Sequence, residues 1–163
     1  VSLASALERE HGVPVTHEIH RGRMTFSAPA VEALLIAAPQ MRLTADFSHW
    51  CCVHESLLAD QAERMDLAIR HSTHIHARVG HPEGPQVNDP RAPEWREAVN
   101  AHLEWWRRIA RHQRSLDADT LTITPEFGPP DYMQTLPFTR QPVADLWEVN
   151  LYMLDMLRER LVE

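Results

Sequence analysis

The 163-residue chain contains no lysine, and all sixteen of its basic side chains are arginine. Without a lysine amine, the chain cannot form a Schiff base with a substrate carbonyl or supply the phosphate-binding lysine of a P-loop. The sequence has only two cysteines, Cys51 and Cys52, and they are adjacent. With no spaced partner they indicate neither a disulfide framework nor a Cys-x-x-Cys zinc site, so we expect a reducing, cytoplasmic location.

Long apolar runs and an excess of positive charge are also missing. No apolar stretch approaches the ~20 residues that span a bilayer, and no signal peptide opens the chain, so we expect no membrane partner. The net charge is -7 without a basic stripe, which argues against nucleic acid as a partner. With 44% hydrophobic and 24% charged residues, the composition is that of an ordinary globular domain or part of one.

Strand-like and helix-like segments alternate along the sequence. Strands are expected at residues 13–18, 41–46, 73–79 and 120–127. Helices are expected at residues 2–11, 30–38, 55–70, 94–114 and 143–161. This alternation is typical of a parallel α/β fold. The strand ends near residues 18, 46 and 76 follow one another at about the ~31-residue length of one βα unit in a (β/α)8 barrel.

Side chains alternate between the two faces of each expected strand, and one face is polar in all four. The polar face carries Thr16, Glu18, Thr44, Asp46, His74, His76, Arg78, Thr122, Thr124 and Glu126. The opposite face is apolar and is expected to pack against the helices; it carries Val13, Val15, Leu43, Ala45, Ile75, Ala77, Val79, Leu121 and Ile123. Each strand therefore ends in an ionisable side chain, at the edge where barrel enzymes keep their active sites.

Four of these side chains, Glu18, Asp46, His76 and Glu126, are expected to converge. Three carboxylates and an imidazole cannot all stay unpaired in a partly buried site. A divalent cation would resolve the charge, and this ligand set suits Mn²⁺, Mg²⁺, Co²⁺ or Zn²⁺. The sequence therefore predicts one divalent metal ion, with Mn²⁺ placed first, and a neighbouring Arg78 that contacts a substrate oxygen.

Four segments, in this order, resemble segments of one enzyme family: HEIHRGR (17–23), DFSHW (46–50), HIHARVG (74–80) and TPEFG (124–128). The family is the sugar isomerase/epimerase branch of the xylose isomerase-like barrels, which includes tagatose and psicose 3-epimerases and hydroxypyruvate isomerases. The resemblance implies that residues 1–163 form the C-terminal half of a (β/α)8 TIM barrel, its strands five to eight. It also implies the metal ligands Glu18, Asp46, His76 and Glu126.

The same resemblance implies an enzyme of carbohydrate metabolism that isomerises or epimerises a sugar or small keto acid. Glu18 and Glu126 would be the catalytic acid/base pair, acting through a metal-chelated enediolate. His49, in an Asp-x-x-His segment, would bind substrate. The family's substrate-binding arginine, six residues after the ligand histidine, is replaced here by Pro82, so Arg78 would take over and the substrate would differ.

Other side chains near these segments are candidate substrate contacts. His20 lies just past the first strand and has either a substrate-binding or a surface role. His74 either contacts substrate or is a hydrogen-bonded neighbour of the site. The loop after the third strand offers His81, Glu83 and Gln86 as weaker candidates.

Two other functions and the question of completeness stay open. A metal-dependent phosphodiesterase of the endonuclease IV type shares this barrel, but it would need more histidine ligands and a basic DNA-facing surface. A non-catalytic binding barrel could keep the fold without turnover. Four βα units leave two exposed parallel edges, so the expected partner is a missing N-terminal half-barrel or a second copy in a homo-oligomer.

Overall fold

The computed structural model describes residues 1–161, so residues 162 and 163 of the expected domain lie outside the described part. The described residues form a mixed α/β fold. Its parallel sheet contains, in chain order, β1 (His17–Glu18), β2 (Leu43–Ala45), β3 (Ser72–Ala77) and β4 (Thr122–Pro125). The α-helices of this region are α1 (Ser2–His11), α2 (Ala28–Ala37), α3 (Phe47–Val53), α4 (Ala62–His71), α5 (Arg96–Ser115) and α6 (Leu146–Leu161). Two short 3-10 helices are η1 (Ala59–Gln61) and η2 (Pro93–Trp95). The parallel α/β class predicted from the alternating pattern is confirmed.

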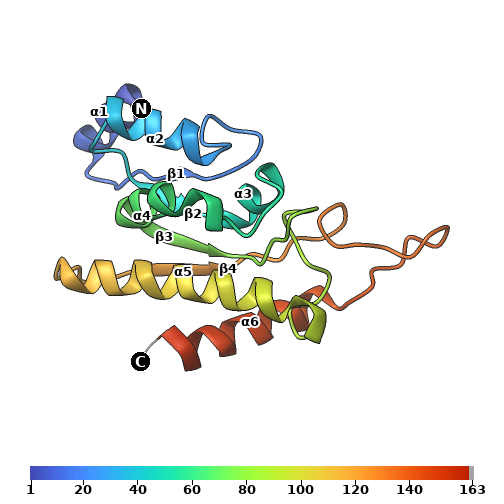
Figure 1. The fold of residues 1–163 in the computed structure, drawn as a ribbon. Helices are drawn as coiled ribbons and strands as arrows, with labels where there is room; N and C mark the ends of the chain where they lie inside the picture. Colours follow the sequence, from blue (N-terminus) through green and yellow to red (C-terminus); the bar gives the residue numbers. More distant parts are fainter. Residues whose placement is uncertain (162–163) are drawn as a thin grey trace.

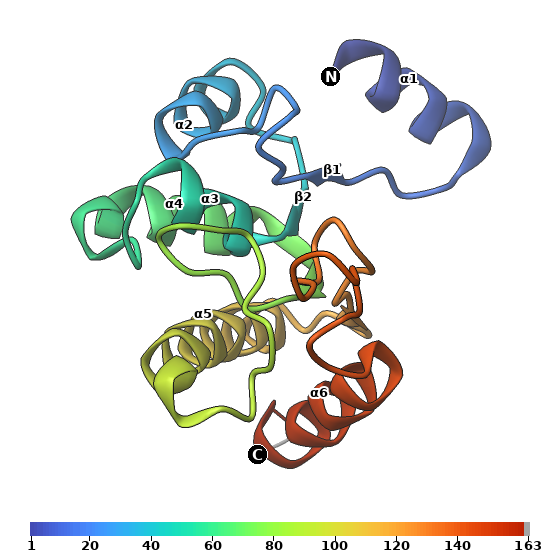
Figure 2. The ribbon, with the colours of Figure 1, turned by 90° about the vertical axis from the view of Figure 1, so that its right-hand side faces the viewer.

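Most of the helices lie along one face of the sheet, and the loops that follow β3 and β4 lie at its carboxyl edge. One face of the sheet packs beside α2, α4, α5 and α6, whereas α1 lies away from these helices (Figure 2). The strands point toward the right in Figure 1, where the loops that follow β3 and β4 extend beyond them. The carboxyl ends of all the parallel strands therefore meet at one edge, beneath these loops. No helix within residues 1–161 has both the length and the apolar character needed to cross a membrane.

Local sequence signals set two helix boundaries. The end of α1 is as expected, whereas α2 begins at Ala28, before the expected start at residue 30. α1 ends at Gly12, whose φ of 66° lies in the left-handed region that glycine adopts without a Cβ penalty. α2 begins after Ser27, whose side-chain oxygen accepts a hydrogen bond from the amide of Ala30.

The two largest errors in the sequence-based boundaries concern the expected strand 13–18 and the expected helix 55–70. The expected strand 13–18 is reduced to His17–Glu18, and Val13 is 60% exposed instead of packing against the helices. β1 is an edge strand that pairs only at His17 and Glu18 among the described residues, so the chain before it has no neighbour to bury it. The helix expected at 55–70 begins at Ala62, and Glu55 has a positive φ, which does not fit a right-handed helix.

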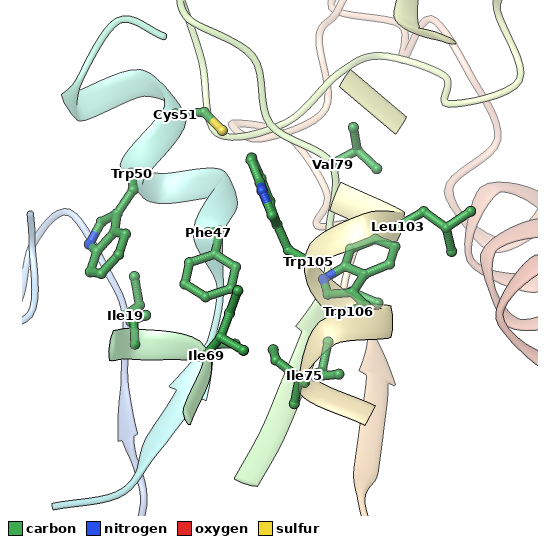
Figure 3. Close-up of a cluster of buried hydrophobic side chains, with 14 of the residues drawn as sticks. Ile19, Phe47, Trp50, Cys51, Ile69, Ile75, Val79, Leu103, Trp105 and Trp106 are labelled. Carbon is green, nitrogen blue, oxygen red and sulfur yellow. The ribbon is translucent and has the colours of Figure 1, made fainter. Parts of the chain in front are cut away.

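The apolar face of the sheet packs against the helices, as predicted for its central strands. The fully buried side chains on it are Leu43, Ala45, Ile75, Ala77 and Val79. Phe47 of α3 and Trp105 of α5 meet edge to face above them, with ring centroids 5.7 Å apart (Figure 3). Aromatic side chains bury large areas and dominate the energetics of such cores. This packing fixes the direction of β2 and β3, and with it the side chains at their carboxyl ends.

Candidate metal centre

Glu18, Asp46, His76 and Glu126 come together at the carboxyl edge of the sheet. Each offers one ligand atom, and these atoms all lie within 4.8 Å of one another. Each residue belongs to a different strand or follows it directly, and parallel strands bring such positions to one edge. Ligand atoms that all bond to one ion at ~2.0–2.3 Å lie about this far from one another. The side chains that sequence reasoning selected are therefore the ones that this edge brings together.

The centre contains buried polar atoms that the protein leaves without a suitable partner. His76 Nδ1 lies 2.7 Å from Glu126 Oε2 and 3.3 Å from Glu18 Oε1. Nδ1 and Glu126 Oε2 are both buried. Although the two atoms lie close together, neither has a well-directed hydrogen bond within the described residues. An unsatisfied buried polar atom costs ~1–3 kcal/mol, and a shared cation would satisfy both atoms. Three carboxylates and one imidazole in this arrangement could hold a metal ion.

His76 also shows how strongly negative this centre is. Burial disfavours the charged imidazolium. The Glu126 carboxylate, with smaller contributions from Asp46 and Glu18, outweighs this and raises the pKa of His76. For Glu126, burial favours the neutral acid, but His76 and Arg78 lower the pKa of its carboxyl overall. The centre thus attracts positive charge, whether a proton or a metal cation.

Arg78 is the protein's own counter-ion at this centre. Its Nη2 donates to Asp46 Oδ2 and lies 3.7 Å from Glu126 Oε2. Asp46 is fully buried, and its other oxygen accepts a hydrogen bond from the Ser48 hydroxyl. Burial raises the pKa of Asp46 to about 6, against the opposing effects of Arg78 and Ser48. Arg78 lies beside the carboxylates as expected, but here it is bound to Asp46.

His49 and His20, two of the predicted substrate-binding histidines, lie against each other beside the centre. His49 is fully buried, and its Nε2 accepts from Arg78 Nη2 at 2.9 Å. Burial, followed by the charge of Arg78, lowers the pKa of His49 to about 2, so the ring is neutral. Its proton therefore lies on Nδ1, which has no hydrogen-bond partner in residues 1–161. The centroid of the His20 ring is 4.0 Å from that of His49.

Tyr132 lies against Arg78 and His20 beside the centre, and sequence reasoning missed it. Its ring centroid lies 4.5 Å from the guanidinium carbon of Arg78. Its hydroxyl lies 3.4 Å from His20 Nε2. Tyr132 belongs to the loop after β4, which has no helical or strand periodicity. The available signal was an aromatic residue shortly after a strand that ends in a candidate ligand.

His74 lies deeper on the polar face of the sheet. Its Nδ1 lies 2.7 Å from Thr122 Oγ1, and its Nε2 lies 3.4 Å from Thr124 Oγ1. The centroid of its ring is 5.1 Å from that of His76. Because threonine hydroxyls of β4 lie next to both ring nitrogens, the geometry favours the hydrogen-bonded neighbour over the substrate contact.

The residues expected to contact substrate from the loop after β3 are placed differently. Gln86 is 3% exposed, and its amide pairs with the backbone of Gly128, so it does not face a substrate. The ring of His81 packs against that of Trp95, with centroids 4.8 Å apart. Through Gln86, the loop helps to build the scaffold of the centre.

Two cavities lie at different distances from the candidate metal centre. A cavity of about 230 Å³ borders the centre; its lining includes Thr16, Glu18, Arg23, Met24 and Thr25. The larger cavity of about 440 Å³ lies between α5, β4 and α6, on the side of the sheet away from the polar face. The smaller one is the cavity relevant to the centre, because it shares Glu18 with it.

No family model, curated protein or solved structure matches this chain. The resemblance to sugar isomerases and epimerases therefore stays a prediction. The function has to be argued from the geometry of the centre.

Proposed function

We propose that this chain is the C-terminal half of a metal-dependent sugar isomerase or epimerase with a (β/α)8 barrel, in which residues 1–163 supply strands five to eight. One observation supports this most strongly. Glu18, Asp46, His76 and Glu126 converge within 4.8 Å at the carboxyl edge of a parallel sheet. Active sites of barrel enzymes are built at this edge.

The four convergent side chains would hold one divalent cation. Three oxygens and one nitrogen form a hard ligand set, which suits Mn²⁺ first and also Mg²⁺, Co²⁺ or Zn²⁺. The bound cation would supply a Lewis acid that polarises a substrate carbonyl.

Glu18 and Glu126 would move the proton. Both carboxylates approach His76 Nδ1, at 3.3 and 2.7 Å, so both would border a substrate carbon next to the centre. One removes the proton alpha to the carbonyl, and the other returns one to the opposite face, which inverts the carbon. Glu126 is ionised at neutral pH and can therefore accept a proton, although His76 and Arg78, which lower its pKa, also make it a weaker base.

Arg78 and His49 would stabilise charge on the substrate oxygens. Arg78 already donates to Asp46 beside the other carboxylates, and the neighbouring His49 has an Nδ1 proton without a hydrogen-bond partner within residues 1–161. Preorganised donors of this kind stabilise the negative charge that develops when a proton leaves the carbon. His20 would contact the substrate at the edge of the centre together with Tyr132, whose hydroxyl lies 3.4 Å from His20 Nε2.

The polar face of the sheet would need a partner. Thr122 and Thr124 are exposed on it, and within residues 1–161 each edge strand has one neighbour. A parallel sheet is normally covered on both faces. A four-stranded second half, either an N-terminal half-barrel or a second copy of the chain, would close the barrel over the centre. We place this enzyme in the cytoplasm, with neither nucleic acid nor membrane as partner.

Metal analysis combined with a substrate screen tests the proposal. The chain, with its barrel completed by the N-terminal half or by a second copy and loaded with Mn²⁺, would be incubated with ketoses and small keto acids in deuterated water. We expect deuterium at the carbon next to the carbonyl of one substrate, together with isomerised or epimerised product. Bound metal without exchange or turnover on any substrate would favour a non-catalytic barrel and contradict the proposal.

A further inference from the structure

Two side-chain amides hold the segment of chain that directly follows Glu126. Asn150 of α6 accepts from the Phe127 amide at 2.9 Å and donates to the Phe127 carbonyl at 3.0 Å. Gln86, in the loop after β3, does the same for Gly128. It accepts from the Gly128 amide at 2.8 Å and donates to its carbonyl at 3.1 Å. Both backbone groups of two successive residues are thus paired by side chains.

These amides continue the pairing of β4 beyond the end of the sheet. β4 ends at Pro125, and the Glu126 amide makes only a long 3.5 Å hydrogen bond to the Ala77 carbonyl. After it, β3 no longer runs alongside. Buried backbone groups left unpaired there would each cost ~1–3 kcal/mol. Asn150 and Gln86 take the place of the missing neighbouring strand.

Carboxamides are well suited to this task. A carboxamide carries a donor and an acceptor side by side, as a peptide group does, and it carries no charge. Gln86 is buried, and so is the Phe127 side chain. The two amides approach from different elements, so the backbone beyond Glu126 is fixed at two consecutive residues. This leaves the Glu126 carboxylate little freedom to move away from His76.

We propose that Gln86 and Asn150 are positioning residues, which hold the Glu126 carboxylate at the place where it meets His76. The proposal rests on the proposed function, because it takes Glu126 as a ligand and a base. Groups that hydrogen-bond directly to metal ligands change metal affinity by ~10- to 100-fold when they are removed, and we expect an effect of this order from groups that hold the backbone next to a ligand.

The test compares three variants of the full chain, Gln86→Met, Asn150→Leu and Gln113→Met, by Mn²⁺ titration and thermal melting. Gln113 is the matched control: it is also buried and donates to a backbone carbonyl, that of Ser72, but at the opposite end of the sheet. We expect the first two variants to bind Mn²⁺ ~10- to 100-fold more weakly. Gln113→Met should keep the wild-type affinity even where its melting temperature falls.

A double-mutant cycle shows whether these residues act through Glu126. In a Glu126→Gln background, Gln86→Met and Asn150→Leu should weaken Mn²⁺ binding no further. Wild-type affinity in either folded variant, or a full further loss in the Glu126→Gln background, would overturn the inference while the proposed function stands. Failure of the wild-type chain to bind Mn²⁺ would instead overturn the proposed function and, with it, the inference.

Discussion

Arg78 and Asp46 form a buried ion pair within the candidate metal centre, and each side chain is at most 4% exposed. Removing one partner of such a pair leaves an uncompensated buried charge, at a cost of ~3–5 kcal/mol. We therefore expect Arg78→Met to melt well below the wild type in metal-free buffer. Because a cation could replace the guanidinium, Mn²⁺ should raise the melting temperature of this variant more than that of the wild type.

The exposed pair of Arg91 and Asp89 gives the control. These side chains are 39% and 26% exposed, and pairs of this kind contribute only ~0–1 kcal/mol. Arg91→Met should melt close to the wild type and respond to Mn²⁺ as the wild type does. An Arg78→Met variant that is stable without metal, or indifferent to it, would contradict the role of Arg78 as the counter-ion of the centre.

A second prediction concerns Gly80, where the chain passes very close to Ser48. A Cβ at this position would lie 2.6 Å from the Ser48 carbonyl oxygen and 2.7 Å from its Cα. Since these are backbone atoms, Gly80→Ala must displace Ser48, whose hydroxyl binds Asp46. We expect a loss of ~1–3 kcal/mol in unfolding free energy, together with weaker Mn²⁺ binding.

Gly22→Ala is the comparison for this variant, because its Cβ would meet only the His20 side chain, at 3.4 Å. Denaturant unfolding and Mn²⁺ titration of both variants would check the prediction. Equal effects at the two glycines would show that the contact with Ser48 has no special importance.

A third prediction uses pH and the buried His102. Its Nδ1 donates to the Ala98 carbonyl, which leaves Nε2 to accept from the Gly80 amide at 3.2 Å. Burial lowers the pKa of His102 from 6.5 to about 4, despite the hydrogen bond to Ala98. The unfolded chain therefore takes up this proton first as the pH falls. Its contribution to stability is complete above about pH 6.5 and is lost toward about pH 4.

At about pH 5 the loss from this histidine is roughly 2 kcal/mol relative to neutral pH. His102→Gln keeps a donor and an acceptor but cannot titrate. We expect its unfolding free energy, measured in denaturant between about pH 7.5 and 5, to fall by roughly 2 kcal/mol less than that of the wild type. Parallel pH profiles for the two proteins would show that His102 is not held neutral in the fold.

The sequence predicts the centre well because strand alternation is a local property. Glu18, Asp46, His76 and Glu126 all lie at or just past strand ends on one face, and parallel pairing brings such positions together. Helix α3 was not foreseen because it is seven residues long and buried on most sides, which removes the amphipathic pattern.

The contacts that surround the centre could not be predicted in the same way. The pairing of Gln86 with Gly128 joins residues 42 positions apart and depends on the path of two loops. The hydrogen bond from Arg78 to Asp46 likewise depends on tertiary packing, since the sequence shows only that both lie at the same edge. Val13 belongs to a strand-like pattern, but no neighbouring strand in the described part of the chain covers it.

A fourth prediction addresses the proposed proton transfer. Glu126→Gln keeps the size of the side chain but removes a base that can accept a proton. We expect deuterium exchange into the substrate to fall by ~10²- to 10⁴-fold, at Mn²⁺ concentrations high enough to saturate the variant. Glu104→Gln, on the exposed face of α5, serves as the control and should exchange at the wild-type rate. A saturated Glu126→Gln variant with near-normal exchange would exclude Glu126 as an acid/base group.

The central claim is that Glu18, Asp46, His76 and Glu126 hold one divalent cation, and calorimetric titration of the metal-free chain with Mn²⁺ tests it most directly. The account predicts one Mn²⁺ per chain, and His76→Leu should abolish this binding. His112→Leu, on the far end of α5 from the centre, should leave it unchanged. No saturable Mn²⁺ binding by the wild-type chain, or the same binding after His76→Leu, would contradict the account.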